Sequence, residues 1–132
     1  MVPDADGNRS LIGHIAKANE MHKIVPQSSD VLAIFHAEDA YISPNWYPSK
    51  ATHHKVVPTW NYQVVHFHGK IEFTNDVKFL RSVVGQLTSL FEKRTNGDMA
   101  WKMRDAPREF LDEQLAAIVG FRITISRCVA KS

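Results

Sequence analysis

The sequence lacks several features that would narrow its function quickly. It contains one cysteine, Cys128, which excludes an internal disulfide or a cysteine-based zinc site within one chain and predicts a reducing, cytoplasmic location. No apolar run approaches the roughly 20 residues that a membrane span needs, and the first residues have no signal-peptide pattern. Charges of one sign never gather in a long run. We therefore expect neither a membrane protein nor an exported one.

Common catalytic signatures are also absent. The chain has no G-x-S-x-G elbow, no P-loop, no Rossmann glycine pattern and no H-E-x-x-H motif. Its formal net charge of +2 is close to neutral, and its basic residues form no stripe of the kind that tracks a DNA backbone. No motif therefore names a reaction, and DNA binding has no recognisable motif behind it.

What the sequence does have is the composition of an ordinary globular domain. Hydrophobic residues make up 44% and charged residues 23% of the chain, which is typical of soluble folds. A chain of 132 residues can bury a real core. We expect one domain over residues 1–132.

Local patterns predict an α+β protein with strands first and two helices in the C-terminal half. Glu38 and Asp39 are interpreted as solubilising turn residues that separate two of the strands. The expected strands are residues 9–15, 31–36 (buried), 41–43, 59–73 and 121–129.

Two helices are expected after the long strand. The first begins near Asp76, repeats apolar residues at steps of three and four, and ends at Asn96-Gly97. The second starts with Asp105 as its cap and Pro107 in its first turn, continues to Ile118, and is ended by Gly120.

The densest chemistry lies between Ala40 and Lys70. This stretch holds two of the three tryptophans, four of the seven histidines and three of the six prolines. Packing alone does not require so many aromatic, hydroxyl, amide and imidazole groups in one segment. The pattern therefore predicts a bound ligand.

A metal is one candidate ligand. His66 and His68 share one face of the expected strand, and with Glu72 they give an H-x-H-x3-E spacing that resembles the first cupin motif. That motif expects glycines where this chain has Trp60 and Phe79, and the second cupin motif is missing. A cupin-like metal enzyme using His66, His68 and Glu72 stays open as an alternative.

A longer resemblance covers most of the chain. The chain contains the blocks AYISPNWY at 40–47, KVVPTWNY at 55–62 and VHFHG at 65–69. These three blocks resemble the signature of the PaiB family, the FMN-binding negative transcriptional regulators. Their order and spacing agree with supporting segments upstream and downstream. These are GHIAKAN at 13–19, WKMRD at 101–105 and AIVGF at 117–121.

The resemblance implies a fold and a set of partners. The fold would be a mainly antiparallel split β-barrel, and the protein a homodimer with flavin sites at the subunit interface. The family's role is repression of sporulation and protease genes in bacteria, which favours a regulator over an enzyme. Family members extend further at both ends, so the barrel would lack their first strands and expose edges that a second copy can cover.

The same resemblance, with the chemistry of FMN, indicates the cofactor residues. A flavin needs an apolar wall for its ring, hydrogen-bond partners for its polar edge and donors for its phosphate. Trp46, Tyr47 and Trp60 would form the wall, and the block containing Pro58, Thr59 and Asn61 the polar edge. The phosphate donors would come from Lys17, Ser43, Ser49, Lys50 and Lys55.

Three functions from different classes remain open at this point. The first is a PaiB-like regulator that binds FMN. The second is a flavin- or heme-handling oxidoreductase on the same split-barrel fold. The third is the cupin-like metal enzyme.

Overall fold

The computed structural model describes residues 2–3, 7 and 9–132. It divides into two compact units. The first consists of residues 1–31 and 69–125, and the second of residues 32–68 and 126–132. Each unit is treated separately below.

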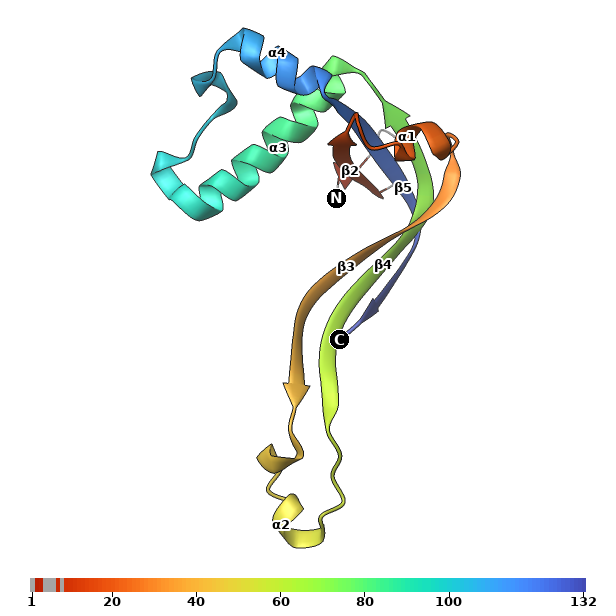
Figure 1. Cartoon of the computed structure of the whole chain (residues 1–132), viewed down its shortest axis with the longest axis vertical. Coiled ribbons are helices and arrows are strands. Elements are labelled where there is room, and N and C mark those ends of the chain that lie inside the picture. Colours follow the sequence, from red (N-terminus) through yellow and green to blue (C-terminus); the bar gives the residue numbers. More distant parts are fainter. Residues whose placement is uncertain (1, 4–6, 8) are drawn as a thin grey trace. The chain divides into compact units, whose positions relative to one another are not determined.

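Within the described residues, five strands form one sheet in the order β1-β2-β5-β4-β3, and neighbouring strands run antiparallel (Figure 1). In the first unit β2 pairs with β5 so that Gly13 lies opposite Phe121. The predicted α+β class with a mainly antiparallel sheet is confirmed. The strands are β1 (Val2–Pro3), β2 (Arg9–Ala16), β3 (Ser29–Ile42), β4 (Thr59–Thr74) and β5 (Ile118–Lys131).

Strand β3 differs most from its sequence prediction. It is one strand of 14 residues, so the predicted break at Glu38 and Asp39 is wrong. Hydrogen bonding to the neighbouring β4 keeps the backbone extended through both carboxylates. The expectation of a buried strand is also wrong, because Leu32, Ile34 and Phe35 are each about half exposed.

Two longer helices lie in the C-terminal half, as predicted. Helix α3 (Val77–Asn96) begins at Asp76, whose carboxylate accepts a hydrogen bond from the Lys78 amide at 2.9 Å, and ends at Gly97, whose φ is 54°. Helix α4 (Arg108–Ala116) is shorter than expected. Gly120 does not end it but lies inside β5. Two single-turn helices, α1 (Met21–Ile24) and α2 (Lys50–His53), precede them.

The hydrophobic core belongs to the first unit. The core side chains come from β4, α3, α4 and β5. Burying one large apolar side chain stabilises the folded state by about 1.5–3 kcal/mol. None of the residues 32–68 and 126–132 reaches the same burial. The core residues are Ile71, Leu80, Val83, Leu115, Val119 and Ile123.

The end of β4 in the first unit is held by a side chain. The Gln27 amide donates to the Phe73 carbonyl at 2.9 Å and accepts from the Phe73 N–H at 2.7 Å. One glutamine thus replaces a residue of a neighbouring strand and satisfies both backbone groups.

Among the described residues, no helix is both long enough and apolar enough to cross a membrane.

Candidate functional site

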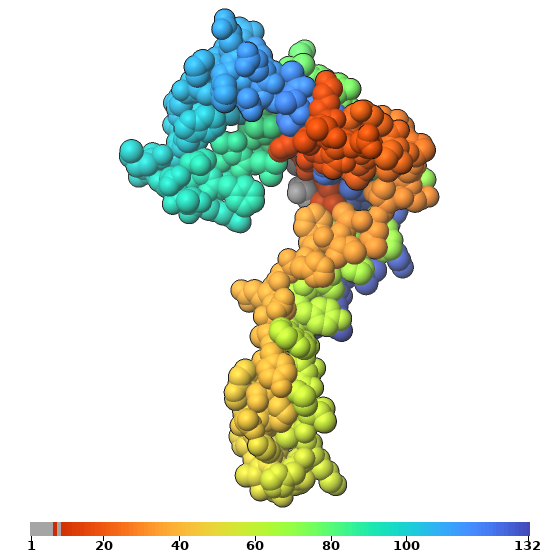
Figure 2. Space-filling view, viewed as in Figure 1, coloured from red at the N-terminus to blue at the C-terminus, as the bar shows by residue number. Residues whose placement is uncertain are grey.

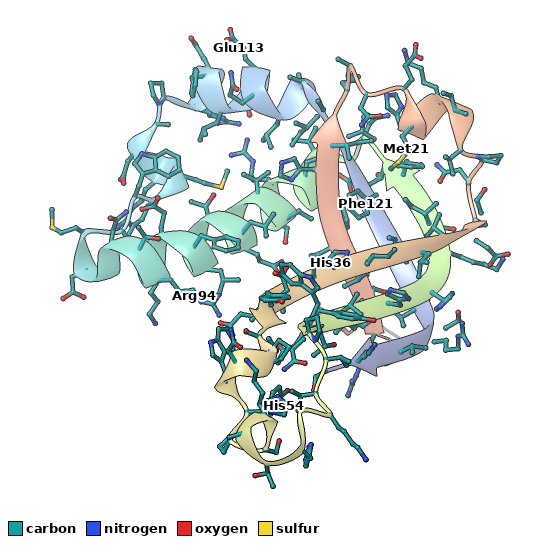
Figure 3. The ribbon with its side chains drawn as sticks, turned by 60° about the horizontal axis from the view of Figure 1, so that its bottom comes forward. Met21, His36, His54, Arg94, Glu113 and Phe121 are labelled. Carbon is teal, nitrogen blue, oxygen red and sulfur yellow. The ribbon has the colours of Figure 1, made fainter. Side chains whose placement is uncertain are left out.

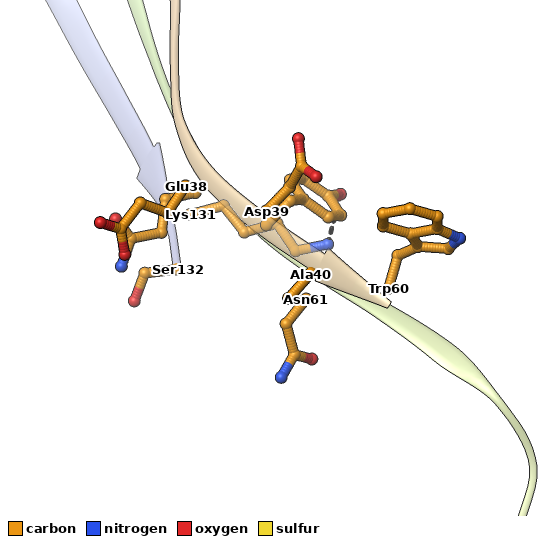
Figure 4. Close-up of a pocket in the computed structure, with 9 residues that line it drawn as sticks. Glu38, Asp39, Ala40, Trp60, Asn61, Lys131 and Ser132 are labelled. Atoms are coloured by element: carbon orange, nitrogen blue, oxygen red, sulfur yellow. Dashed lines mark hydrogen bonds between the residues drawn. The ribbon is translucent and has the colours of Figure 1, made fainter. Parts of the chain in front are cut away.

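The second unit carries an open groove along its strands. The groove has a volume of about 760 Å³, which is within the range of small-molecule sites. Figure 4 shows it between β3, β4 and the end of β5. Its lining is Glu38, Asp39, Ala40, Trp60, Asn61, Tyr62, Gln63, Lys131 and Ser132. We call it the strand groove.

Aromatic rings form the apolar part of the strand groove. Trp60 is 61% exposed and meets Tyr41 edge to face, with ring centroids 5.8 Å apart. The Lys131 ammonium lies 4.1 Å from the Tyr62 ring centroid and donates to the Tyr62 hydroxyl at 2.5 Å (Figure 4). The rings therefore offer a stacking surface with one cation beside it.

Polar groups complete the rim of the strand groove. Asn61 and Gln63 contribute amides, which can both donate and accept hydrogen bonds. In Figure 4 Asn61 and Trp60 point to different sides of β4, as consecutive strand residues do. Glu38 and Asp39, which we interpreted from the sequence as turn residues, add two carboxylates to the rim.

Sequence reasoning missed several groove residues. Tyr62 and Gln63 belong to the predicted long strand, and their period-two spacing from Trp60 and Asn61 could have included them. Lys131 and Ser132 come from the far end of the chain. No local pattern links those two residues to β4, because only the sheet order brings β5 beside it.

A second, separate pocket lies in the loop between β3 and β4. Its volume is about 540 Å³. The loop contains a 3-10 turn, Pro44–Trp46, followed by α2. The lining residues are Asn45, Trp46, Tyr47, Pro48, Lys50, Ala51 and His54. We call it the loop pocket, and it shares no lining residue with the strand groove.

The structure thus divides the predicted cofactor residues. Trp60 and Asn61 line the strand groove, whereas Trp46, Tyr47 and Lys50 line the loop pocket. The remaining predicted residues line neither of them: Lys17, Ser43, Ser49, Lys55, Pro58 and Thr59.

Several of the predicted phosphate donors already have partners. The Ser43 hydroxyl accepts from the Asn45 amide at 3.2 Å and caps the 3-10 turn. Lys17 lies in the first unit, where its ammonium is 3.4 Å from the Ala116 carbonyl. Lys50 donates to the side-chain oxygen of Asn45.

The alternative metal site gains no support. Within the part of the chain that is described, no three His, Cys, Asp or Glu side chains are grouped so that they could hold a metal. His68 Nε2 instead lies 2.9 Å from Arg127 Nη2. Because arginine can only donate, this ring nitrogen must accept. Glu72 accepts from the Ser28 hydroxyl at 3.2 Å.

The donor set of the strand groove fits a flavin mononucleotide. The rings of Trp60 and Tyr62 can face an isoalloxazine. Lys131 is the cation available to a phosphate. The two carboxylates can accept hydrogen bonds from ribityl hydroxyls.

Comparison with known proteins agrees with this chemistry. A family model described as a putative FMN-binding domain matches residues 1–127. The Bacillus subtilis protein named protease synthase and sporulation protein PAI 2 is 32% identical over 91% of this chain and 54% of its own length. An uncharacterized Saccharomyces cerevisiae protein is 36% identical over 70% of this chain and 56% of its own.

The chain spans about half the length of these two relatives. They come from a bacterium and a yeast, so such sequences are not confined to bacteria. A crystal structure from Bacteroides thetaiotaomicron, described as a putative 5-nitroimidazole antibiotic resistance protein, is a more distant likeness. It has a TM-score of 0.49 and 12% identity, over 98% of this chain and 72% of that one.

Proposed function

The chain belongs to this FMN-binding-domain family, and from that membership we propose that it binds FMN and acts as a PaiB-like negative regulator of transcription. The observation that carries the FMN proposal is the strand groove, where exposed aromatic rings and a lysine line a volume of about 760 Å³. The regulatory part is supported by the PaiB resemblance and by similarity to the Bacillus subtilis protein.

The aromatic and cationic groups of the strand groove have roles in this proposal. Trp60 and Tyr62 face the flavin ring, and Lys131 neutralises phosphate charge. Lys131 already rests on the Tyr62 ring, so a ligand that stacks on this ring must move the ammonium aside. Bound FMN would supply electron-transfer chemistry.

The proposal includes a homodimer in the cytoplasm. The edge position of β3 and its exposed apolar residues support a second copy as partner. The single cysteine, Cys128, is exposed, and the lack of a second one supports a reducing compartment. Repression by such a protein acts on DNA directly or through a partner protein.

Titration with FMN tests the cofactor. We expect quenching of flavin fluorescence by the protein, and about threefold to tenfold weaker binding for Trp60→Ala, since stacked aromatic pairs contribute about 0.5–1.5 kcal/mol. Trp101→Ala is the matched control, because Trp101 lies outside the strand groove and is 42% exposed. An absorption spectrum of the complex distinguishes flavin from heme.

Two results would reject the FMN proposal. One is unchanged flavin fluorescence at tens of micromolar protein. The other is an equal loss of affinity in the Trp60 and Trp101 variants, which would indicate general destabilisation. For the regulatory part, deletion of the gene should raise transcription of its targets, and unchanged transcript levels would reject it.

A further inference from the structure

The loop pocket is left without a role when the strand groove holds the flavin. The loop between β3 and β4 carries it, and Figure 3 labels His54 there. In Figure 2 this segment, coloured yellow, lies uncovered at the surface of its unit. The volume of the loop pocket, about 540 Å³, is enough for a ligand of nucleotide size.

The segment that carries the loop pocket has charged side chains of one sign. From Ala40 to Ile71 the sequence contains no aspartate and no glutamate. The same loop carries Lys50 and Lys55 with two histidines between them. A site with cations and no nearby carboxylate in its own segment favours an anionic ligand.

Two aromatic rings line the loop pocket together with Lys50. Trp46 is 65% and Tyr47 is 41% exposed. Their backbone is nevertheless fixed by the 3-10 turn, in which the Trp46 amide donates to the Ser43 carbonyl at 3.1 Å and the Tyr47 amide to the Pro44 carbonyl at 3.3 Å. Large aromatic side chains held in solvent by an ordered turn are typical of a recognition surface.

The lysine that lines the loop pocket is also held in place by a hydrogen bond. Lys50 begins α2, and its ammonium donates to the side-chain oxygen of Asn45, the residue before Trp46. His54 follows α2 in the left-handed conformation, with φ of 52°, and also lines the pocket. The Trp46 ring and the Lys50 ammonium therefore come from the same short segment of the loop.

We propose that the loop pocket binds a nucleotide, with an unpaired base stacked on Trp46 and a phosphate at Lys50 and His54. Nucleic-acid bases stack on aromatic side chains whatever the nucleotide sequence, and lysines contact the phosphates. A free nucleotide and a single strand of nucleic acid share this chemistry. The site is independent of the flavin, because it uses none of the residues of the strand groove.

Fluorescence anisotropy with a labelled oligothymidylate of about 12 nucleotides tests the site. We expect Trp46→Ala to weaken binding by about 5-fold to 100-fold, the effect of losing one stacked base. Lys50→Gln should lower the slope of log affinity against log salt by about 0.7, the loss of one phosphate contact on a single strand. Thymidine monophosphate as competitor separates the two sources of the nucleotide.

Matched variants keep this result separate from the flavin proposal. Trp101→Ala and Lys78→Gln change an exposed tryptophan and an exposed lysine of the first unit, and should leave oligonucleotide binding unchanged. Trp60→Ala should weaken FMN but not the oligonucleotide, and Trp46→Ala the reverse.

Three outcomes would overturn the nucleotide site. The first is the absence of binding to oligonucleotide and mononucleotide at about 100 µM and low salt. The second is full affinity in the Trp46→Ala variant. The third is loss of FMN and oligonucleotide together in that variant, which would make the loop pocket part of a single flavin site.

Discussion

Gly120 lies on β5 beneath helix α3, where an added Cβ would come within 2.8 Å of the Phe79 ring and 3.0 Å of a Leu80 methyl. Leu80 is 2% exposed and has little room to move. The close approach of α3 to the sheet therefore depends on the missing side chain at residue 120.

We expect Gly120→Ala to lower the free energy of unfolding by about 1–3 kcal/mol, the usual cost of overpacking a core. Urea denaturation of the purified protein measures the change. Gly85→Ala is the control, because Gly85 is inside α3 and its nearest neighbour would be the Met103 sulfur at 3.4 Å. That variant should be neutral or gain up to about 1 kcal/mol from helix propensity. Equal losses in both variants would contradict the packing argument.

Among the elements, α3 could be predicted in full because its signals are local. Asp76, the apolar repeat and Asn96-Gly97 all lie within the helix or next to it. Strand β3 could not, because its continuity through Glu38 and Asp39 depends on β4. The start of β5 was missed because Gly120, taken as a helix stop, is selected by packing under α3.

The candidate site was predicted only in part, because some of its residues have local sequence signals and others are brought in by strand pairing. Trp60 and Asn61 lie in a recognisable block, and they do line the strand groove. Lys131 reaches the groove only through the sheet order. Trp46 and Lys50 were grouped with Trp60 by resemblance, and the structure assigns them to another pocket.

The segment that follows α3 is tied back to the helix by one carboxylate. Glu92 accepts from the Asn96 side-chain amide at 2.7 Å and from the Trp101 backbone amide at 3.0 Å. These two hydrogen bonds lower the pKa of Glu92 below its ordinary value, and the bond from Asn96 has the larger effect. The charged form thus stabilises the folded state above the ordinary glutamate pKa, and this stability is lost as the pH falls through the lower folded pKa.

We expect Glu92→Gln to lower the midpoint of thermal unfolding at about pH 7, and the difference from the unsubstituted protein to shrink below about pH 4. Differential scanning calorimetry across this range measures it. Glu113→Gln, an exposed position on α4, is the control and should change little. A Glu92 effect that persists undiminished in acid would reject the assignment to the charged carboxylate.

On the scale of the whole molecule, the second unit raises the question of what covers its apolar residues. None of its residues is fully buried, and β3 is the edge of the described sheet. A unit without its own core normally packs against something else. The proposed second copy would meet this need.

We expect a dimer in sedimentation analysis at micromolar concentration. Ile34→Lys should raise the dissociation constant at least about tenfold, because Ile34 is 48% exposed on the edge strand and burying such a side chain contributes about 2 kcal/mol. Thr95→Lys near the end of α3 is the control. A monomeric unsubstituted protein, or no difference between the two variants, would defeat the dimer.

The clamp between Gln27 and Phe73 has a consequence for hydrogen exchange. The backbone N–H of Phe73 donates to the Gln27 side-chain oxygen, with 2.7 Å between nitrogen and oxygen, and not to a neighbouring strand. Its exchange with deuterium therefore requires only a rotation of the Gln27 side chain, whereas amides in the β2–β5 ladder wait for the sheet to open. This one proton would report on side-chain motion at the end of β4 while the rest of the sheet stays protected.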